Sequence, residues 1–480
     1  MDGRSLLSVF AGKRITIIGL AREGVALARF LVEAGAQVTV SDLKGRDQLQ
    51  ESIAKLEGLP LRYVLGGHPL ELLETDLLFL SPGVPLDAPL VQAAQQCRVP
   101  ISTETRLFLE LCPAPVIGIT GSSGKTTTVT LVGEMCRAEG RPTFVGGNIG
   151  QPLIGRLGEI RPDDRVVMEL SSFQLDHFAP WQPGTKGADL FPFLCRGKSP
   201  HIAAILNITP NHLDRHATME EYIAAKKQIM LHQGAQDYVI LGQDDPMASS
   251  LRPYAVGKLL TFSLRKPVSQ GTFLAKGMVT VRLDGLEMPI CSTQEIRLRG
   301  RHNVANILAA CAITAAAGVP VTSMVSVATR FSGVEHRLEY VRELRGARYY
   351  NDSIATSPER AIAALQAFDD PIVLLAGGRD KHLPWDRWAE LVARKARHVI
   401  LFGEAASLIE RAIRQGWTEA GASYPQVIRC ETMEEAVHKA AALAQPGDVV
   451  LLSPGGTSFD AFRDYAERGA RFKELVKALV

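Results

Sequence analysis

One stretch, residues 115–137, constrains the fold of this chain more than any other. An apolar run at 116–119 predicts a buried parallel strand, and a turn at 120–124 with two glycines follows it. Lys125 then opens a predicted helix whose apolar residues recur at helical spacing. A strand, a glycine-rich turn and a helix N-terminus together form an anion cradle, because backbone N–H groups and the helix dipole both favour phosphate there.

The residues of this turn predict a site for a nucleoside triphosphate. Lys125 supplies a positive charge for the β- and γ-phosphates, and the Thr126 hydroxyl is suited to Mg²⁺. Gly121 and Gly124 enclose fewer residues than the usual pattern does, so the loop is a shortened variant. A plain turn that caps a helix is the alternative. The predicted triphosphate-binding residues are Gly121, Ser122, Ser123, Gly124, Lys125, Thr126 and Thr127.

Length and composition bound the class of protein. A chain of 480 residues is too long for one core, so about two to four domains are expected. The formal net charge of +2, with no basic cluster, gives no reason to expect nucleic acid. No apolar run predicts a membrane span, and the N-terminus lacks an export-type cleavage site. The seven scattered cysteines, without a CxxC pair, favour the reduced thiols of a cytoplasmic protein.

The first part of the chain predicts a Rossmann-like domain. A strand at 14–19 leads through a turn and a helix to a second strand at 37–40. Ala21 stands where GxGxxG has its second glycine, which favours a nucleotide diphosphate over a dinucleotide cofactor but leaves both open. A further strand at 76–80 ends in a tight loop, and open α/β sheets bind ligands at that edge. Asp42 either holds a ribose hydroxyl or caps a turn.

After a proline-containing linker at 112–115, a second α/β pattern surrounds the phosphate loop. A buried strand at 165–170 carries Glu169, one or two strands from that loop, where a Mg²⁺ ligand belongs; capping the next turn is the alternative. His212 follows a strand at 201–209 and is either a ligand or base or a structural residue. A helix at 220–233 carries Lys226 and Lys227, for which a solvated helix face is the plainer interpretation.

Residues 177–200 are rich in proline, glycine and aromatic residues and show no period. They predict a long surface loop with its aromatic side chains packed beneath it. Strands are expected at 238–241, 260–263, 278–283 and 295–298, followed by a buried helix at 302–318. Asn303 and Asn306 lie on one face of that helix near its N-terminus, where their amides can reach a ligand.

The α/β alternation restarts after a second boundary, near 318–322 or 331–333. A hairpin is expected at 340–350, and three later strands end in glycine-rich loops. If that sheet is parallel, these loops face one crevice. They and the loop after the hairpin carry the polar residues Asp352, Thr356, Lys381 and Ser458.

Several segments, taken in order, resemble the Mur ligases of peptidoglycan synthesis. They are ITGSSGKTTT, GGNIG, ELSSFQLD, ILNITPNHLDRH, AAK, GRHNVANILAA, FSGVEHRLE, YYNDSIATS and LLSPGGTSFDAF. The resemblance covers nearly the whole chain and implies an α/β protein of three domains: a Rossmann-like UDP-sugar-binding domain at 1–112, a central P-loop ATPase domain at 113–320 and a Rossmann-like amino-acid-binding domain at 321–480. The motifs are most similar to those of members that add D-glutamate to UDP-N-acetylmuramoyl-L-alanine.

The resemblance also implies a reaction and a set of site residues. ATP phosphorylates the terminal carboxylate of the substrate, and the D-glutamate amine then attacks the acyl phosphate. Lys125, His212 and Lys226 are implied as catalytic, with Lys226 carbamylated as a ligand for a second Mg²⁺. The implied ligands of the two Mg²⁺ ions are Thr126, Glu169, His212 and Lys226. The other implied contacts are Asn303, Asn306, Arg337 and Asp352 for ATP, Leu20, Asp42, Lys44, Gly83, Asn148 and Ser171 for the UDP-substrate, and Thr356, Lys381, Ser458 and Tyr465 for D-glutamate.

Other functions stay open beside this one. A sister ligase that adds L-alanine to UDP-N-acetylmuramate, or folylpolyglutamate synthase, shares the central pattern, although the N-terminal Rossmann-like pattern disfavours the folate enzyme. A P-loop switch without ligase activity would hydrolyse ATP with no need for a UDP-sugar. A nicotinamide oxidoreductase is disfavoured by Ala21 and by the phosphate loop. A cytoplasmic monomer that binds neither nucleic acid nor membrane is expected.

Overall fold

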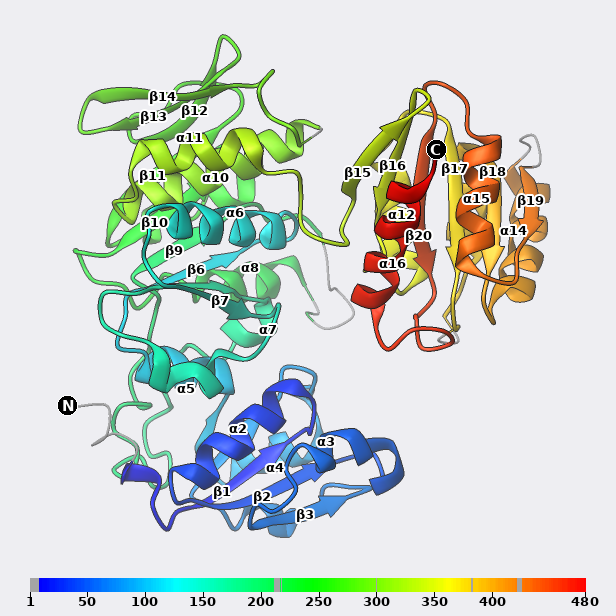
Figure 1. Ribbon diagram of the computed structural model, residues 1–480. Helices are drawn as coiled ribbons and strands as arrows, with labels where there is room; N and C mark the ends of the chain where they lie inside the picture. The colour runs from blue at the N-terminus through cyan, green and yellow to red at the C-terminus, as the bar shows by residue number, and fades with distance from the viewer. Residues whose placement is uncertain (1–7, 211–215, 217, 299, 381–382, 421–424) are drawn as a thin grey trace. The chain divides into compact units, whose positions relative to one another are not determined.

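The computed structural model describes residues 8–210, 216, 218–298, 300–380, 383–420 and 425–480. The chain divides into two compact units, Met1–Phe331 and Ser332–Val480. The first unit holds two sheets and the second unit holds one, and helices cover the faces of all three (Figure 1). The α/β class predicted from the sequence is confirmed.

The N-terminal sheet is parallel throughout and has the strand order β3-β2-β1-β4-β5. This is the order of the first five strands of the Rossmann sheet, so the predicted Rossmann-like architecture is confirmed. Its strands are β1 (Arg14–Ile18), β2 (Gln37–Asp42), β3 (Leu61–Leu65), β4 (Leu77–Leu80) and β5 (Ile101–Ser102). Its helices are η1 (Ser8–Phe10), α2 (Arg22–Glu33), η2 (Arg46–Leu49), α3 (Gln50–Ala54), η3 (Leu70–Leu73) and α4 (Pro89–Gln96), and α5 (Glu104–Leu111) follows β5.

The central sheet has nine strands in the order β14-β13-β12-β11-β10-β9-β6-β8-β7. It is parallel from β7 to β12, and β13 and β14 add an antiparallel edge. The strand of the phosphate loop, β6 (Val116–Thr120), lies between β9 and β8 and is buried along its whole length. The carboxyl ends of β9 and β8 therefore flank the loop that β6 carries, on either side.

The other strands of this sheet are β7 (Thr143–Gly147), β8 (Arg165–Glu169), β9 (Ile202–Ile205), β10 (Tyr238–Gly242), β11 (Lys258–Ser263), β12 (Gly271–Ala275), β13 (Met278–Leu283) and β14 (Leu286–Ser292). Its helices are α6 (Lys125–Ala138), η4 (Leu153–Glu159), α7 (Ser172–Leu175), α8 (Met219–Lys227), α9 (Pro246–Ser249), η5 (Arg252–Tyr254), α10 (Arg301–Ala316) and α11 (Val321–Arg330).

Two sequence predictions about these elements were wrong. The strand expected at 295–298 is a turn, because β14 ends at Ser292 and the Glu295 carboxylate accepts a hydrogen bond from the Ser292 backbone N–H at 2.7 Å. The helix expected at 220–233 ends at Lys227 and continues as single turns. Strands β12 and β14 of this sheet were not predicted from the sequence.

The C-terminal sheet has the order β15-β16-β20-β17-β18-β19. The predicted hairpin is confirmed, because β15 pairs with β16 antiparallel and every other pair is parallel. Its strands are β15 (Glu339–Leu344), β16 (Ala347–Asn351), β17 (Ile372–Gly377), β18 (Ala396–Phe402), β19 (Gln426–Arg429) and β20 (Val449–Gly455). Its helices are α12 (Pro358–Gln366), α13 (Asp386–Lys395), α14 (Ala406–Ala420), α15 (Met433–Leu443) and α16 (Tyr465–Ala478).

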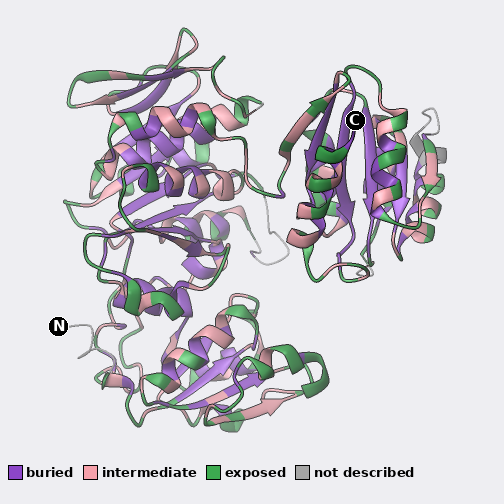
Figure 2. Ribbon diagram, in the orientation of Figure 1, coloured by how far each residue is buried: buried purple, intermediate pink, exposed green. Residues whose placement is uncertain are grey.

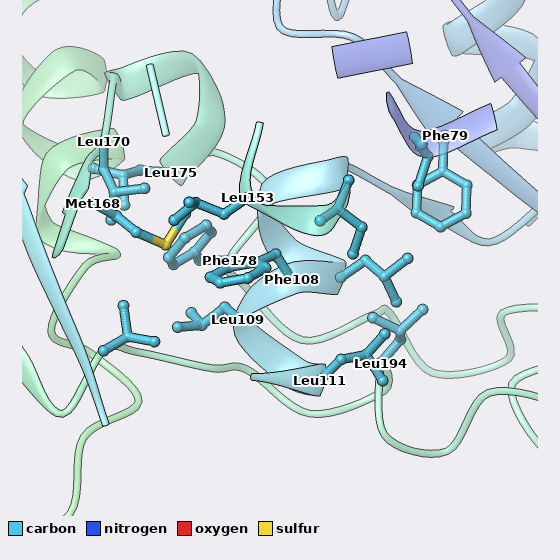
Figure 3. Packing of buried hydrophobic residues seen from close by; sticks show 14 of the residues in the cluster. Phe79, Phe108, Leu109, Leu111, Leu153, Met168, Leu170, Leu175, Phe178 and Leu194 are labelled. Atoms are coloured by element: carbon cyan, nitrogen blue, oxygen red, sulfur yellow. The ribbon is translucent and has the colours of Figure 1, made fainter. Parts of the chain in front are cut away.

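Burial follows the layers: the central strands are buried and the helices expose their outer faces (Figure 2). One hydrophobic cluster runs from the N-terminal sheet through α5 into the central sheet. In Figure 3, Phe79 of β4, Phe108 of α5 and Met168 of β8 belong to this cluster. The two sheets of the first unit therefore share a core. The predicted loop at 177–200 is also confirmed, since its residues form no helix or strand and Phe178 and Phe191 are fully buried.

Candidate functional site

The phosphate loop is held in a shape that requires glycine. Gly124 has φ 78°, and a Cβ atom there would lie 2.4 Å from Oδ1 of Asn306. Lys125 begins α6 and its Nζ donates to the Gly121 carbonyl at 2.8 Å. Asn306 in turn receives a hydrogen bond from Thr128 at 3.5 Å and donates to Asn303 at 3.1 Å. The structure thus brings the predicted residues of α10 beside the predicted phosphate loop.

Asn207 fixes this loop from the end of β9 and was not predicted. Its backbone carbonyl accepts from Ser122 N at 3.0 Å, and its Oδ1 accepts from Ser123 N at 2.9 Å. The Asn207 amide also donates to the Ser123 carbonyl at 3.1 Å. An asparagine directly after a buried strand next to β6 was the signal that could have identified it.

Glu169 closes β8, the strand that neighbours β6 in the sheet, as the sequence predicted. The side chain is buried, and each of its oxygens accepts one hydrogen bond. Thr126 Oγ1 donates to one oxygen at 2.9 Å and Asn148 Nδ2 donates to the other at 2.9 Å. A buried carboxylate, a hydroxyl and an amide therefore meet where the triphosphate would end.

Lys226 lies behind the phosphate loop instead of on a solvated face. Its side chain is 1% exposed, and Nζ donates to Thr120 Oγ1 at 3.3 Å and to the Gly121 carbonyl at 3.1 Å. Nζ also lies 4.6 Å from the centre of the Tyr222 ring. Burial lowers the pKa of the Lys226 ammonium to about 7, and the charge of Lys125 acts in the same direction. An amine with this pKa is largely neutral above pH 7, which makes it a nucleophile.

Ser171 starts α7 with a capping box that points toward the N-terminal sheet. Gln174 Oε1 accepts from Ser171 N at 3.0 Å, and Gln174 N donates to Ser171 Oγ at 3.3 Å. Gln174 Nε2 then donates to Glu23 at 3.1 Å and to Thr105 Oγ1 at 2.9 Å. The spacing S-x-x-Q before an apolar residue could have identified Gln174. His212 lies outside the described residues.

At the N-terminal sheet, Leu20, Asp42, Lys44 and Gly83 lie after the carboxyl ends of β1, β2 and β4. Asp42 accepts from Leu20 N at 2.8 Å and from Lys44 N at 2.9 Å. The turn-capping role of Asp42 is therefore present in the structure, and it places the Asp42 carboxylate at the sheet edge where a nucleotide would bind. Lys44 and Gly83 are exposed, whereas Leu20 is buried.

Two acidic residues behind this edge were not predicted. Glu23 in the first turn of α2 and Glu104 in the first turn of α5 line one small cavity. Burial raises the pKa of Glu23 to about 7, and burial together with the charge of Glu23 raises the pKa of Glu104 to about 8. The Glu23 Oε2 atom is buried without a hydrogen-bond partner.

The second unit carries a further group of predicted residues at the ends of its strands. Asp352 follows β16 and is buried, with Oδ2 accepting from Ser453 Oγ at 2.9 Å and Oδ1 from Leu338 N at 3.2 Å. Burial raises its pKa to about 7, against the nearby charge of Arg337. Thr356 and Ser458 lie in loops after β16 and β20, and Tyr465 is an exposed residue that starts α16. Lys381 lies outside the described residues.

Arg468 holds these loops together and had no signal in the sequence. The side chain is fully buried in α16, and its guanidinium donates to the carbonyls of Ser353, Gly456 and Thr457 at 2.9–3.2 Å. It also donates to Ser353 Oγ at 3.0 Å. One buried cation therefore fixes the ends of both β16 and β20, on which Asp352, Thr356 and Ser458 sit.

Within the described ranges, no group of three histidine, cysteine, aspartate or glutamate side chains converges on a point. The predicted ligands include Thr126 and Lys226, which are of other types. In the same part of the chain, every helix is too short or too polar to cross a bilayer.

Three known family descriptions match the chain in order. They are the MurD-like N-terminal domain of Mur ligases at residues 13–103, the Mur ligase middle domain at 119–314 and the Mur ligase glutamate ligase domain at 336–456. Together they cover all three sheets.

Similar proteins extend over the full length. A UDP-N-acetylmuramoylalanine–D-glutamate ligase of Symbiobacterium thermophilum is 46% identical, over 97% of this chain and 98% of that protein. One of the same name from Pelotomaculum thermopropionicum is 38% identical over 99% of each chain. Among solved structures, UDP-N-acetylmuramate-alanine ligase of Thermotoga maritima shares the fold with a TM-score of 0.54 at 19% identity, covering 97% of this chain and 99% of that one.

Proposed function

Because the chain belongs to the Mur ligase family, we propose that it joins D-glutamate to UDP-N-acetylmuramoyl-L-alanine in an ATP-dependent step of peptidoglycan synthesis. The observation that carries this proposal is the identity of 46% and 38%, over almost the whole chain, to two relatives with that named activity. The cradle of Lys125, Thr126 and Glu169 supports it, since it combines the groups that phosphoryl transfer requires.

The proposed reaction has two steps. A carboxylate oxygen of the alanyl group attacks the γ-phosphorus of ATP, and ADP leaves. The amine of D-glutamate then attacks the carbonyl carbon of the acyl phosphate, loses a proton and expels phosphate. All the reacting groups except the amine are anionic, so the cation Lys125 and the N-terminus of α6 lower their mutual repulsion.

We divide the substrates over three domains, 1–112, 113–320 and 321–480. The UDP-substrate is assigned to the N-terminal sheet edge together with Asn148 and Ser171, and ATP to the phosphate loop with Asn303, Asn306, Arg337 and Asp352. D-glutamate is assigned to the loops after β16, β17 and β20, with Thr356, Lys381, Ser458 and Tyr465 as its contacts. Among the described residues of these groups, all but Arg337, which precedes β15, lie near the carboxyl ends of parallel strands or the N-terminal part of a helix, which are the usual positions of such sites.

The residues around Glu169 fit a magnesium ion. Mg²⁺ prefers oxygen ligands, and the buried Glu169 carboxylate and the Thr126 hydroxyl provide them beside the phosphate loop. Bound there with ATP, the ion would neutralise phosphate charge. Thr126 and Glu169 would hold it, with His212 and the modified Lys226 as further ligands of the proposed two-ion site.

We further propose that Lys226 is carbamylated. As an amine it fits no magnesium ion, but its nitrogen can attack the carbon of CO₂ and release one proton, which leaves a carbamate with two oxygens. Its pKa of about 7 and its burial favour this reaction over protonation. Incubation with ¹³C-bicarbonate should give a carbamate carbon resonance that is absent from Lys226→Ala but present in Lys227→Ala.

The experiment that tests the ligase proposal is a panel of acceptors and amino acids. Purified protein with ATP and Mg²⁺ should release phosphate and form a new amide only when UDP-N-acetylmuramoyl-L-alanine and D-glutamate are both present. Amide formation from UDP-N-acetylmuramate and L-alanine would move the assignment to a sister ligase. ATP hydrolysis that needs no UDP-sugar would favour a switch. The seven free cysteines agree with the cytoplasm as the expected location, and gel filtration would test the expected monomer.

A further inference from the structure

Residues 177–200, here called the strap, form a closed loop in the first unit although they contain no helix or strand. Two backbone hydrogen bonds close its neck. Lys198 N donates to the Phe178 carbonyl at 3.3 Å, and Trp181 N donates to the Cys195 carbonyl at 3.2 Å. A loop of this length in a compact domain commonly serves a function, because ordering it costs conformational entropy that something must offset.

Arg106 of α5 lies inside this neck and binds both of its sides. The Arg106 side chain is fully buried. Its Nη1 donates to the carbonyls of His177 at 2.7 Å and Ala179 at 2.9 Å. Its Nη2 donates to the carbonyls of Leu194 at 3.1 Å and Arg196. A guanidinium is the one side chain whose planar fork can satisfy four carbonyls from two chain segments at once.

A buried carboxylate completes this arrangement. Arg106 Nε donates to Glu110 Oε1 at 3.3 Å, one helical turn further along α5. Glu110 Oε2 lies 4.0 Å from Lys198 Nζ of the strap. The charge of the buried arginine is therefore compensated within α5, which lowers the cost of burying it.

The far side of the strap contacts the N-terminal sheet. Lys186 N donates to the Arg98 carbonyl at 2.8 Å, and Trp181 Nε1 donates to the carbonyl of Ile101 in β5 at 2.7 Å. The Phe191 ring lies 5.7 Å from the ring of Phe10, before β1. The strap thus connects to the sheet at several points, between α4 and β5 and ahead of β1.

The near side of the strap packs into the shared core. Figure 3 shows Phe178 and Leu194 of the strap beside Phe108 and Leu111 of α5, in the cluster that also contains Met168 of β8. Helix α5 is the segment that joins the N-terminal sheet to the central sheet along the chain. The strap adds a connection between the two sheets that runs through space instead of along the sequence, beside the hydrogen bonds of Gln174 to Glu23 and Thr105.

We propose that the strap fixes the N-terminal sheet edge relative to the phosphate loop, and that Arg106 is the positioning residue that keeps the strap closed. From the proposed function this inference takes only the positions of the substrates. There the UDP-substrate spans both sheets, whereas ATP contacts the central sheet within this unit. Opening the strap should therefore weaken the binding of the UDP-substrate and leave the binding of ATP unchanged.

The test uses the full-length variant Arg106→Lys. Lysine keeps the charge, but its ammonium has only three N–H donors on one nitrogen and cannot bond four separated carbonyls. We expect the KM for UDP-N-acetylmuramoyl-L-alanine to rise about tenfold while the KM for ATP stays within about twofold. Chymotrypsin should cleave the strap, at Phe178, Trp181, Phe191 or Phe193, about tenfold faster than in the wild type.

Two further variants make the result specific. Arg196→Ala removes an exposed arginine of the strap whose backbone carbonyl, not its side chain, bonds Arg106, so it should behave as the wild type. Trp181→Phe loses only the hydrogen bond to the Ile101 carbonyl. It should raise the KM for the UDP-substrate and the rate of strap cleavage by about threefold each. This variant also tests the proposal if Arg106→Lys fails to fold.

The proposal is overturned if Arg106→Lys and Trp181→Phe leave strap cleavage at the wild-type rate, or if both KM values rise together. A fall in melting temperature alone, without either change, overturns it as well. Chymotryptic cleavage needs no ligase substrate. A wild type that forms no amide would therefore reject the proposed function and leave the cleavage test of the strap valid.

Discussion

Two strand–turn–helix units of the first part of the chain have similar backbones, but basic residues lie behind one turn and acidic residues lie behind the other. In β6–α6, Lys125 and Lys226 both donate to the carbonyl of Gly121, at 2.8 and 3.1 Å. In β1–α2, the acidic Glu23 and Glu104 line the cavity behind the turn. Both turns use glycine in the left-handed region, Gly19 with φ 95° in the first and Gly124 with φ 78° in the second.

The difference teaches that the glycine turn sets the shape of a phosphate site and the buried groups behind it set the charge that it accepts. The cation Lys125 suits a triphosphate, and the carbamate that we propose for Lys226 suits its magnesium. A carboxyl pair suits the less highly charged UDP part of a substrate. In addition, the Leu20 N–H already donates to the Asp42 carboxylate, so it is not available to bind an anion. The following predictions test this contrast.

The largest effect is expected from Lys125→Met. The substitution keeps the volume of the side chain and removes the cation nearest the transferred phosphoryl group. We expect kcat/KM for ATP to fall by about 10⁴-fold, since such cations contribute about 10³ to 10⁵ in phosphoryl transfer. Steady-state phosphate release measures it. A loss of less than tenfold would mean that β6–α6 does not grip the triphosphate through its cation.

Lys226→Ala should lower kcat by about 10³-fold, with residual activity that does not respond to bicarbonate. The reason is the loss of the group that becomes a metal ligand, and of two hydrogen bonds to the loop. Lys227→Ala is the matched control, because Lys227 is adjacent but packs on Tyr254 at 4.1 Å. It should stay within about twofold of the wild type. Equal losses in both variants would contradict the role of Lys226.

The contrast between these lysines also shows what could be predicted from sequence. The strand–turn–helix at 115–137, the Rossmann-like N-terminal domain and Glu169 beside the loop followed from local patterns. The burial of Lys226 did not, because it depends on how α8 packs beneath β6. The structural roles of Arg106 and Arg468 could not be predicted for the same reason. Each is fixed by backbone carbonyls that the chain brings from distant segments, and such carbonyls have no sequence signature.

Asp42→Asn should have a moderate effect confined to the other turn. An amide cannot accept from both Leu20 N and Lys44 N, so the free energy of unfolding should fall by about 1–2 kcal/mol. If the carboxylate also contacts the substrate, the KM for the UDP-substrate should rise about tenfold with the KM for ATP unchanged. A loss of stability without a change in KM would assign Asp42 to the turn alone and end the ribose hypothesis.

The smallest effect, Glu104→Gln, concerns the dependence of stability on pH. The pKa of Glu104 is raised to about 8 by burial, so between pH 5 and 8 the folded state holds a proton that the unfolded state has released. The free energy of unfolding therefore decreases as pH rises through this range. Glutamine cannot titrate, so the variant has no proton to release at this position as pH rises. The variant should be more stable than the wild type at pH 8, with a slope flattened by up to about 1.4 kcal/mol per pH unit.

Urea unfolding at several pH values measures this slope, and Glu33→Gln is the control, because Glu33 is an exposed glutamate of α2. Glu33→Gln should keep the wild-type slope. If Glu104→Gln keeps it too, the carboxyl pair does not hold its proton. The carboxyl groups behind the turn β1–α2 would then be negatively charged. The groups behind β1–α2 and β6–α6 would differ by having opposite charges, and not by one site being neutral and the other cationic.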